Sequence, residues 1–325
     1  MKMKRLLVPA LIFFVVAIKP AQTDAQRLYR IGAVVASDQF VPAVAGFKKR
    51  MDELGYIEGK NVKYDVYNAH NDLEEVKKIA QKLVQEKPDL IVTSSTTATA
   101  PVAKASAGTN IPVVFLSAGN PLAFVKSYAS SGNNLTGISA AAIDLTPKRM
   151  ELLKELAPGI KRLISINNPN GTNYQENLRA TRAAAKKLGF KLIEVDITSR
   201  EELIQWAKSH LSRKLGDAVF YPPDSIILEA MQEAFPYIVR EKLPSVSVNV
   251  ARVKEGALAA YGPDYFALGQ QGAVLVDKVL KGARPMDLPI EQPLKLNLMI
   301  NLKTAKAIGL KISKEILLRA DEIIE

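Results

Sequence analysis

Short apolar runs and amphipathic stretches alternate along most of this chain. Apolar runs occupy 31–35, 90–92 and 111–116, each bounded by turn-forming or hydroxyl residues. Runs of this length between turn signals are typical of buried parallel strands. Between them, apolar residues recur at helical spacing, as in 41–54 and 73–85. The alternation predicts βαβ units and therefore an α/β chain with parallel sheets.

The pattern changes near residues 140–146 and then restarts. A predicted helix at 147–156 leads into a predicted strand at 163–167. A chain of 325 residues is longer than one hydrophobic core usually supports. We therefore expect two βαβ halves whose strands end in polar loops on either side of a cleft. A predicted helix at 225–239 contains Pro236, which we expect to shorten or kink it.

The first 26 residues have the pattern of a secretory signal peptide. Positive residues in 1–5 precede an apolar run at 6–18, and small residues at 23–25 offer a cleavage site. The apolar run is short for a membrane span, and an uncleaved anchor is the alternative. No cysteine follows it, so we expect no lipid anchor and a periplasmic location.

Composition and charge narrow the function classes. Hydrophobic residues make up 48% of the chain, which favours packed cores over disorder. Of 44 basic and 33 acidic side chains, four and one lie in the predicted leader, so 40 and 32 remain, a net charge of +8. The basic residues alternate with acidic ones and form no stripe interleaved with aromatics, which argues against nucleic-acid binding.

The sequence also lacks the usual signs of catalysis. There is no cysteine, and His70 and His210 have no acidic or histidine neighbour at ligand spacing. Neither a Gly-x-Ser-x-Gly elbow nor a phosphate-binding loop occurs, and 32–36 lacks the glycines of a dinucleotide-binding turn. We expect a protein that is not an enzyme, without metal or cofactor.

Several longer segments carry a resemblance to a known family. The chain resembles the solute-binding proteins of ABC transporters, in the subfamily that includes aromatic amino-acid (tryptophan/tyrosine-type) binding proteins. The similarity covers essentially the whole chain after the leader. The segments are ELGYIEGKN at 53–61, PDLIV at 88–92, NLTG at 134–137, GALAAYGPDYFALG at 256–269 and INLKTAK at 300–306, with Ala320 and Asp321 near the end.

This resemblance implies a type I periplasmic-binding fold of two Rossmann-like lobes with parallel sheets, joined by a three-segment hinge. It implies that lobe 1 takes 27–140 plus 263–281, and lobe 2 takes 141–262 plus 282–325. It also implies a monomer that traps a small carboxylate-bearing ligand, an amino acid or related organic acid, and delivers it to a membrane permease. The alternatives are a sensor subunit for a membrane receptor and a binder of a sugar or nucleoside.

The expected ligand contacts lie in loops at strand ends. Hydroxyls and helix amides at 94–97 suit an anion such as a carboxylate, or simply cap a helix. Asp224 either caps the following helix or meets an ammonium, and Asn168 either contacts ligand or forms a turn. Phe40 and Tyr174 stack on a ligand or only pack. The full expected set is Asp38, Phe40, Ser94, Ser95, Thr96, Thr97, Ser117, Asn120, Asn168, Asn173, Tyr174, Pro222, Asp224, Asn249 and Tyr261.

Two positions depart from the family pattern. Relatives commonly carry Asp where this chain has Asn120 and Asn249. An ammonium desolvated in a closed cleft usually needs a carboxylate. Two hypotheses follow: the ligand is less cationic than an ordinary amino acid, or Asp38 or Asp224 supplies the charge.

Overall fold

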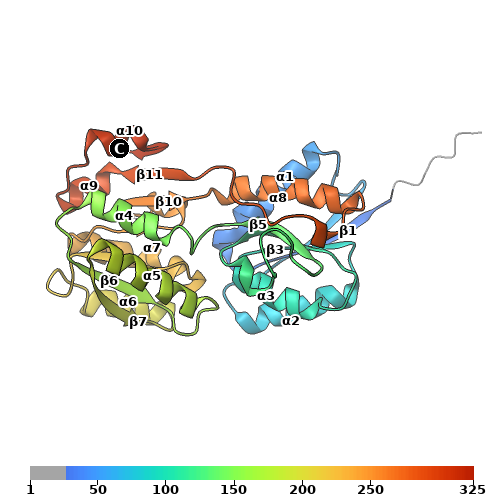
Figure 1. Ribbon diagram of the computed structural model, residues 1–325, viewed down its shortest axis with the longest axis horizontal. Helices are drawn as coiled ribbons and strands as arrows, with labels where there is room; N and C mark the ends of the chain where they lie inside the picture. The colour runs from blue at the N-terminus through green and yellow to red at the C-terminus, as the bar shows by residue number, and fades with distance from the viewer. Residues whose placement is uncertain (1–26) are drawn as a thin grey trace, which may run out of the picture.

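The computed structural model describes residues 27–325, which form two α/β lobes lying side by side (Figure 1). The predicted signal peptide at 1–26 lies outside the described residues. Lobe 1 holds the N-terminal elements and one helix from late in the chain, whereas lobe 2 holds the middle of the chain and the C-terminus. Within 27–325 no helix is both long and apolar enough to span a bilayer.

Lobe 1 is a parallel sheet covered by helices on both faces. Its strands are β1 (Tyr29–Val35), β2 (Val62–Asn68), β3 (Leu90–Ser94), β4 (Val113–Ala118) and β5 (Leu135–Ser139), in the order β2-β1-β3-β4-β5. Its helices are α1 (Val41–Glu53), α2 (Leu73–Glu86), α3 (Thr96–Ala105) and α8 (Tyr265–Leu280), with short turns η1 (Asp38–Phe40), η2 (Pro121–Ala123) and η4 (Pro285–Asp287). Helices α1 and α8 lie together on one face, and α2 and α3 lie on the other. The predicted α/β class is confirmed.

Two glycines allow α8 to join lobe 1. A Cβ on Gly46 of α1 would lie 2.0 Å from the carbonyl oxygen of Phe266, and one on Gly269 of α8 would lie 1.8 Å from that of Ala43. No side chain fits at either contact, so the two helix backbones approach closely only because both residues are glycine. This contact fixes the start of α8, which borders the candidate site.

Lobe 2 contains two groups of strands joined by a bridge between Val219 and Ser245. Their orders are β7-β6-β8 and β12-β11-β10-β9, and only β11 runs antiparallel to its neighbour β10. The strands are β6 (Arg162–Asn167), β7 (Lys191–Asp196), β8 (Ala218–Phe220), β9 (Val246–Ser247), β10 (Ala259–Gly262), β11 (Asn297–Asn301) and β12 (Glu322–Ile324).

Helices cover both faces of the lobe 2 sheet, as the continuous burial of β6 from Leu163 to Asn167 requires. They are α4 (Thr146–Leu156), α5 (Tyr174–Leu188), α6 (Arg200–Ser209), α7 (Ser225–Arg240), α9 (Leu302–Ile308) and α10 (Lys314–Arg319), with η3 (Val250–Val253). Leu163 of β6 packs with α4 and α5, whereas Ile164 and Ile166 pack with α6 and α7. Two separate apolar clusters therefore hold the layers together.

Two expectations need correction. The chain does not return to lobe 2 after residue 281, because Ile290 packs in the core of lobe 1 and Glu291 pairs with Ile138 of β5. The third crossover therefore follows residue 291. Of the two effects expected of Pro236, shortening does not occur, because α7 continues to Arg240. Buried Met231, Phe235 and Ile238 lie on both sides of the proline, and their packing offsets the lost backbone hydrogen bond.

Candidate ligand-binding site

The candidate site begins where β1 and β3 end next to each other in lobe 1. In a sheet of this strand order, the connections after these two strands leave in opposite directions and open a crevice. Ser95 follows β3 as the N-cap of α3, and its Oγ accepts from the N–H of Ala98 at 3.1 Å. Its φ of 90° is unusual for a residue other than glycine. This backbone strain sits at the edge of the crevice, where functional sites often store it.

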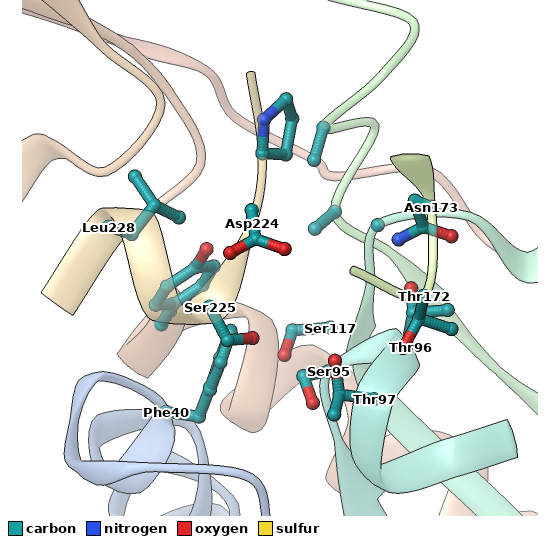
Figure 2. Close-up of a pocket in the computed structure, with 15 residues that line it drawn as sticks. Phe40, Ser95, Thr96, Thr97, Ser117, Thr172, Asn173, Asp224, Ser225 and Leu228 are labelled. Carbon is teal, nitrogen blue, oxygen red and sulfur yellow. The ribbon is translucent and has the colours of Figure 1, made fainter. Parts of the chain in front are cut away.

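A cavity lies between this crevice and the facing loops of lobe 2. The empty space between these walls is about 440 Å³, and part of it is open to solvent. In Figure 2 the carboxylate of Asp224 points into the space from lobe 2, and the hydroxyls of Ser95, Thr97 and Ser117 lie opposite it. Thr172 lies to one side of them.

The lobe 1 wall presents hydroxyl groups without any charge. Thr96 Oγ1 accepts from the backbone N–H of Asn120 at 3.0 Å, and the Oγ atoms of Ser94 and Ser117 lie 2.8 Å apart. Ser95 and Thr96 are used here as acceptors, so their own O–H protons remain able to donate. Together with the N-terminal amides of α3, this wall suits an anionic group.

The lobe 2 wall contributes one buried carboxylate, that of Asp224. Its Oδ1 accepts from the N–H groups of Ile226 and Ile227 at 3.0 Å each, and the side-chain amide of Asn168 lies 3.2 Å from both of its oxygens. Burial raises the pKa of Asp224 above its ordinary value, although these hydrogen bonds act in the opposite direction. Asp224 thus caps α7 and also faces the cavity, so the two sequence interpretations are compatible.

An apolar surface completes the cavity. The rings of Phe40 and Tyr265 lie 5.2 Å apart between centroids at an interplanar angle of 40°, and Leu228 of α7 is buried beside the same space. Burial raises the pKa of Tyr265 to about 12, so its hydroxyl is neutral at physiological pH. The two rings form one continuous aromatic surface on lobe 1.

Seven of the fifteen expected residues line this cavity. They are Phe40, Ser95, Thr96, Thr97, Ser117, Asn173 and Asp224. Ser94 is fully buried and bonded to Ser117 behind the wall. Asn120 lies at the rim, where its Nδ2 donates to Asn173 Oδ1 across the two lobes at 3.3 Å.

Three more expected residues line a smaller cavity behind Asp224. Asn168, Tyr174 and Pro222 border a space of about 190 Å³ that shares Asp224 with the main cavity. The Tyr174 hydroxyl lies 3.3 Å from both carboxylate oxygens of Asp196, which directs it away from the main cavity. Asn168 therefore acts on the main cavity through Asp224.

The remaining three lie away from the cavity. Asp38 and Asn249 border a different hollow on the surface, and Asn249 Oδ1 caps η3 by accepting from the Ala251 N–H at 3.0 Å. The side chain of Tyr261 packs against the lobe 2 core. The expectation that His70 lacks an acidic partner is wrong, because its Nδ1 lies 3.6 Å from Asp38 Oδ1. Both side chains are 73% exposed, so the pair sits in solvent.

Sequence reasoning missed part of the cavity wall. Tyr265 reaches the cavity only because the chain returns to lobe 1 after β10. The sequence signal for the start of α8 is Asp264, which caps the helix by accepting from the Ala267 N–H. The small residues of the wall carry no recognisable signal. The unpredicted lining residues are Gly119, Ala140, Ala142, Thr172, Pro223, Ser225, Leu228 and Tyr265.

The lobes touch directly around the cavity. Besides the Asn120–Asn173 bond, Gln39 Nε2 donates to the carbonyl of Ser225 at 3.3 Å, and Asn71 Nδ2 donates to Glu229. These bonds join lobe 1 loops to α7 and to the loop before α5. The lobes are therefore in a closed arrangement around the cavity.

The family model for ABC transporter substrate-binding proteins matches residues 30–324. The chain belongs to this family. It is 32% identical over 297 residues to a tyrosine-binding protein of Clostridioides difficile, an alignment that covers 89% of this chain and 84% of the relative. The two lobes and their strand order accordingly form a type I periplasmic-binding fold.

Two solved structures differ in how well they superpose on this chain. A Streptococcus pneumoniae protein in complex with L-Trp gives a TM-score of 0.82 at 25% identity, covering 91% of this chain and 99% of that one. A ligand-free, open substrate-binding protein with adhesive properties from Clostridium difficile gives 0.68 at 26% identity with the same coverage. At nearly equal identity, the chain superposes better on the L-Trp complex than on the ligand-free, open structure.

Proposed function

We propose that this protein binds an aromatic L-amino acid between its lobes outside the cytoplasm and delivers it to the permease of an ABC importer. The observation that carries the proposal is the opposition of Asp224 to the hydroxyl wall of α3 across one cavity. The carboxylate of an amino-acid zwitterion matches the hydroxyl wall of lobe 1, and its ammonium matches Asp224 of lobe 2. The names of the tyrosine-binding relative and of the L-Trp complex support the same ligand class.

The orientation follows from the charges of the walls. The ligand carboxylate accepts from the hydroxyls of Ser95, Thr96 and Thr97 and from the first amides of α3. The ligand ammonium pairs with Asp224, and the aromatic side chain lies against Phe40. Hydrogen bonds to charged groups contribute about 1.5–3 kcal/mol each, so three or four of them supply most of a micromolar affinity.

The positions of the two family departures bear on the charge of the ligand. Neither Asn120 nor Asn249 lines the cavity, so the missing carboxylates there do not act directly on a bound ammonium. Asp38 also lies outside it, whereas Asp224 is buried within it. This favours the hypothesis in which Asp224 supplies the negative charge and the ligand is an ordinary amino acid.

The proposed location and the proposed permease partner rest on the family and on the leader sequence. A binding protein of an importer needs no covalent chemistry: ligand binding favours the closed form, and the closed form is the state presented to the permease. The predicted signal peptide at 1–26 provides export, and we propose that the mature protein works in the periplasm as a monomer.

The decisive experiment is calorimetric titration of residues 27–325 with three matched compounds. These are L-tyrosine, tyramine, which lacks the carboxylate, and 3-(4-hydroxyphenyl)propionate, which lacks the amine. We expect binding of tyrosine and at least 100-fold weaker binding of the other two, because each leaves one charged wall unpaired. Equal affinity for the compound without an amine would remove Asp224 from the proposal. Binding of sugars or nucleosides alone would overturn the amino-acid assignment.

A further inference from the structure

Arg149 of α4 is the largest fully buried side chain in residues 27–325. Within that part of the chain it forms no ion pair with a carboxylate, and its Nη2 has no hydrogen-bond partner. Burial lowers the pKa of Arg149 to about 10, so it remains protonated at neutral pH. An unpaired buried cation is strongly destabilising, and such groups persist where they serve a purpose other than stability.

The hydrogen bonds of Arg149 indicate that purpose. Its Nη1 donates to the carbonyl of Ala142 at 2.6 Å, and its Nε donates to the carbonyl of Tyr261 at 2.8 Å. Ala142 belongs to the first crossover between the lobes, which runs from β5 to α4. Tyr261 lies at the end of β10, directly before the second crossover leads to α8. One guanidinium therefore joins two of the three segments that form the hinge.

The first crossover is under backbone strain at the point that Arg149 holds. Ala141 has a φ of 48°, in the left-handed region that residues with a Cβ rarely occupy. Its N–H donates to Ser139 Oγ at 2.9 Å, and Arg149 binds the carbonyl of the next residue. Ala140 and Ala142, on either side of Ala141, both line the ligand cavity. The strained residue is thus fixed from both sides, and it shapes the cavity wall.

We propose that Arg149 is a positioning residue that couples the ligand cavity to the hinge by tying the Ala142 and Tyr261 carbonyls together. With this tie in place, the wall at 140–142 and the start of the second crossover move as one unit. Filling the cavity then favours lobe closure. The tie needs the fork geometry of arginine, because a lysine ammonium is too compact to reach two separate carbonyls from one side chain.

The test uses a pair of labels on opposite lobes. The chain has no cysteine, so Lys78→Cys on α2 and Lys187→Cys on α5 accept dyes specifically at two exposed sites. Single-molecule energy transfer then reports the distance between the lobes in Arg149→Met, Arg149→Lys and the parent protein. A matched control is Leu153→Ala, which opens a cavity under the same helix and keeps both hydrogen bonds of Arg149.

We expect Arg149→Met to shift the ligand-free distribution toward longer distances and to weaken L-tyrosine binding at least tenfold. Arg149→Lys should behave like Arg149→Met, since it keeps the charge but loses the tie. Leu153→Ala should lower the melting temperature without changing the distribution. A folded Arg149→Met with parental distances and affinity would overturn the inference, and so would full rescue by Arg149→Lys.

Two further comparisons separate this inference from the proposed function and from a failure of Arg149→Met to fold. Only the affinity arm rests on the proposed ligand, so failure of the parent protein to bind tyrosine would refute the proposed function while the ligand-free distances still test Arg149. If Arg149→Met does not fold, Ala141→Gly takes its place, because glycine relieves the strain that the tie maintains. We expect it to shift the distances toward the closed form without lowering the melting temperature, because glycine removes a strain that the closed arrangement carries. Unchanged distances in Ala141→Gly would overturn the inference.

Discussion

The two walls of the cavity are built in opposite ways. Lobe 1 presents several uncharged donors, the hydroxyls of 95–97 and of Ser117, on a loop and helix set by local sequence. Lobe 2 presents one buried carboxylate, Asp224, held by backbone amides and by Asn168. Each of several weak donors contributes a small part of the binding free energy, whereas a single charged group contributes a large part of it. Substitutions on the two sides should therefore differ in size and in dependence on pH.

The largest effect is expected at Asp224. Asp224→Asn keeps an N-cap for α7, since asparagine caps helices as well as aspartate does. It removes the only carboxylate among the described residues that line the cavity, so we expect tyrosine affinity to fall at least 100-fold, about 2.7 kcal/mol. Calorimetry measures it, and circular dichroism checks that α7 is intact. A loss below threefold would mean that the ammonium lies elsewhere.

The same carboxylate should make the empty protein sensitive to pH. Burial raises the folded-state pKa of Asp224, so the folded state holds the proton more tightly than the unfolded state. Its stabilising contribution is complete below the unfolded pKa of about 3.9 and is lost as pH rises through the folded value. Ligand-free Asp224→Asn should therefore gain stability relative to the parent between pH 4 and 8. Parallel thermal unfolding curves at every pH would contradict this.

Ligand binding should show the opposite trend with pH, because only ionised Asp224 pairs with an ammonium. We expect tyrosine affinity of the parent protein to weaken as the pH falls through the raised pKa of Asp224. Asp224→Asn should lack this step. Titrations at matched ionic strength measure it, and a step of equal size in both proteins would assign the titration to another group.

A smaller effect is expected on the lobe 1 wall. Thr97→Val removes one hydroxyl donor to the ligand carboxylate and keeps the shape of the side chain, so we expect about tenfold weaker tyrosine binding. Thr97→Ser restores the hydroxyl and serves as the control. The loss should not vary with pH between 5 and 8. A loss as large as that of Asp224→Asn would remove the contrast between the two walls.

The smallest effect is expected at the rim. Asn120→Ala deletes the bond to Asn173 between the lobes, and one neutral hydrogen bond contributes about 0.5–1.5 kcal/mol. We expect a two- to tenfold loss of affinity, carried by faster ligand release in stopped-flow measurements. Asn170→Ala, at an exposed position on the facing loop, is the control and should release ligand at the parental rate.

Local sequence predicts one wall better than the other. The strand at 90–94 and the capping residues after it are determined by neighbours in the chain. The location of the hydroxyl groups at 95–97 could therefore be predicted from the local sequence. Asp38 and Asp224 look alike in sequence, since each follows a predicted strand. Only packing distinguishes them: Asp224 is enclosed by Asn168 and α7, whereas Asp38 faces solvent.

The positions of residues that depend on the hinge could not be predicted from the sequence. Tyr265 enters the cavity through the second crossover, which periodicity does not reveal. Arg149 sits in an amphipathic helix, where an arginine normally faces water, and its burial follows from two crossovers that pass over it. The third crossover was placed too early for the same reason, because 285–291 packs on β5 by contacts distant in sequence.

The close contact of α1 with α8 has a consequence for biosynthesis. Lobe 1 begins at residue 27, yet the helix that covers one face of its sheet ends at Leu280. During synthesis at about 5–20 residues per second, the N-terminal half waits on the order of ten seconds for this helix to emerge. Over that interval the face of β4 that α8 later covers stays open. Lobe 1 therefore cannot complete its native packing until nearly the whole polypeptide has been made.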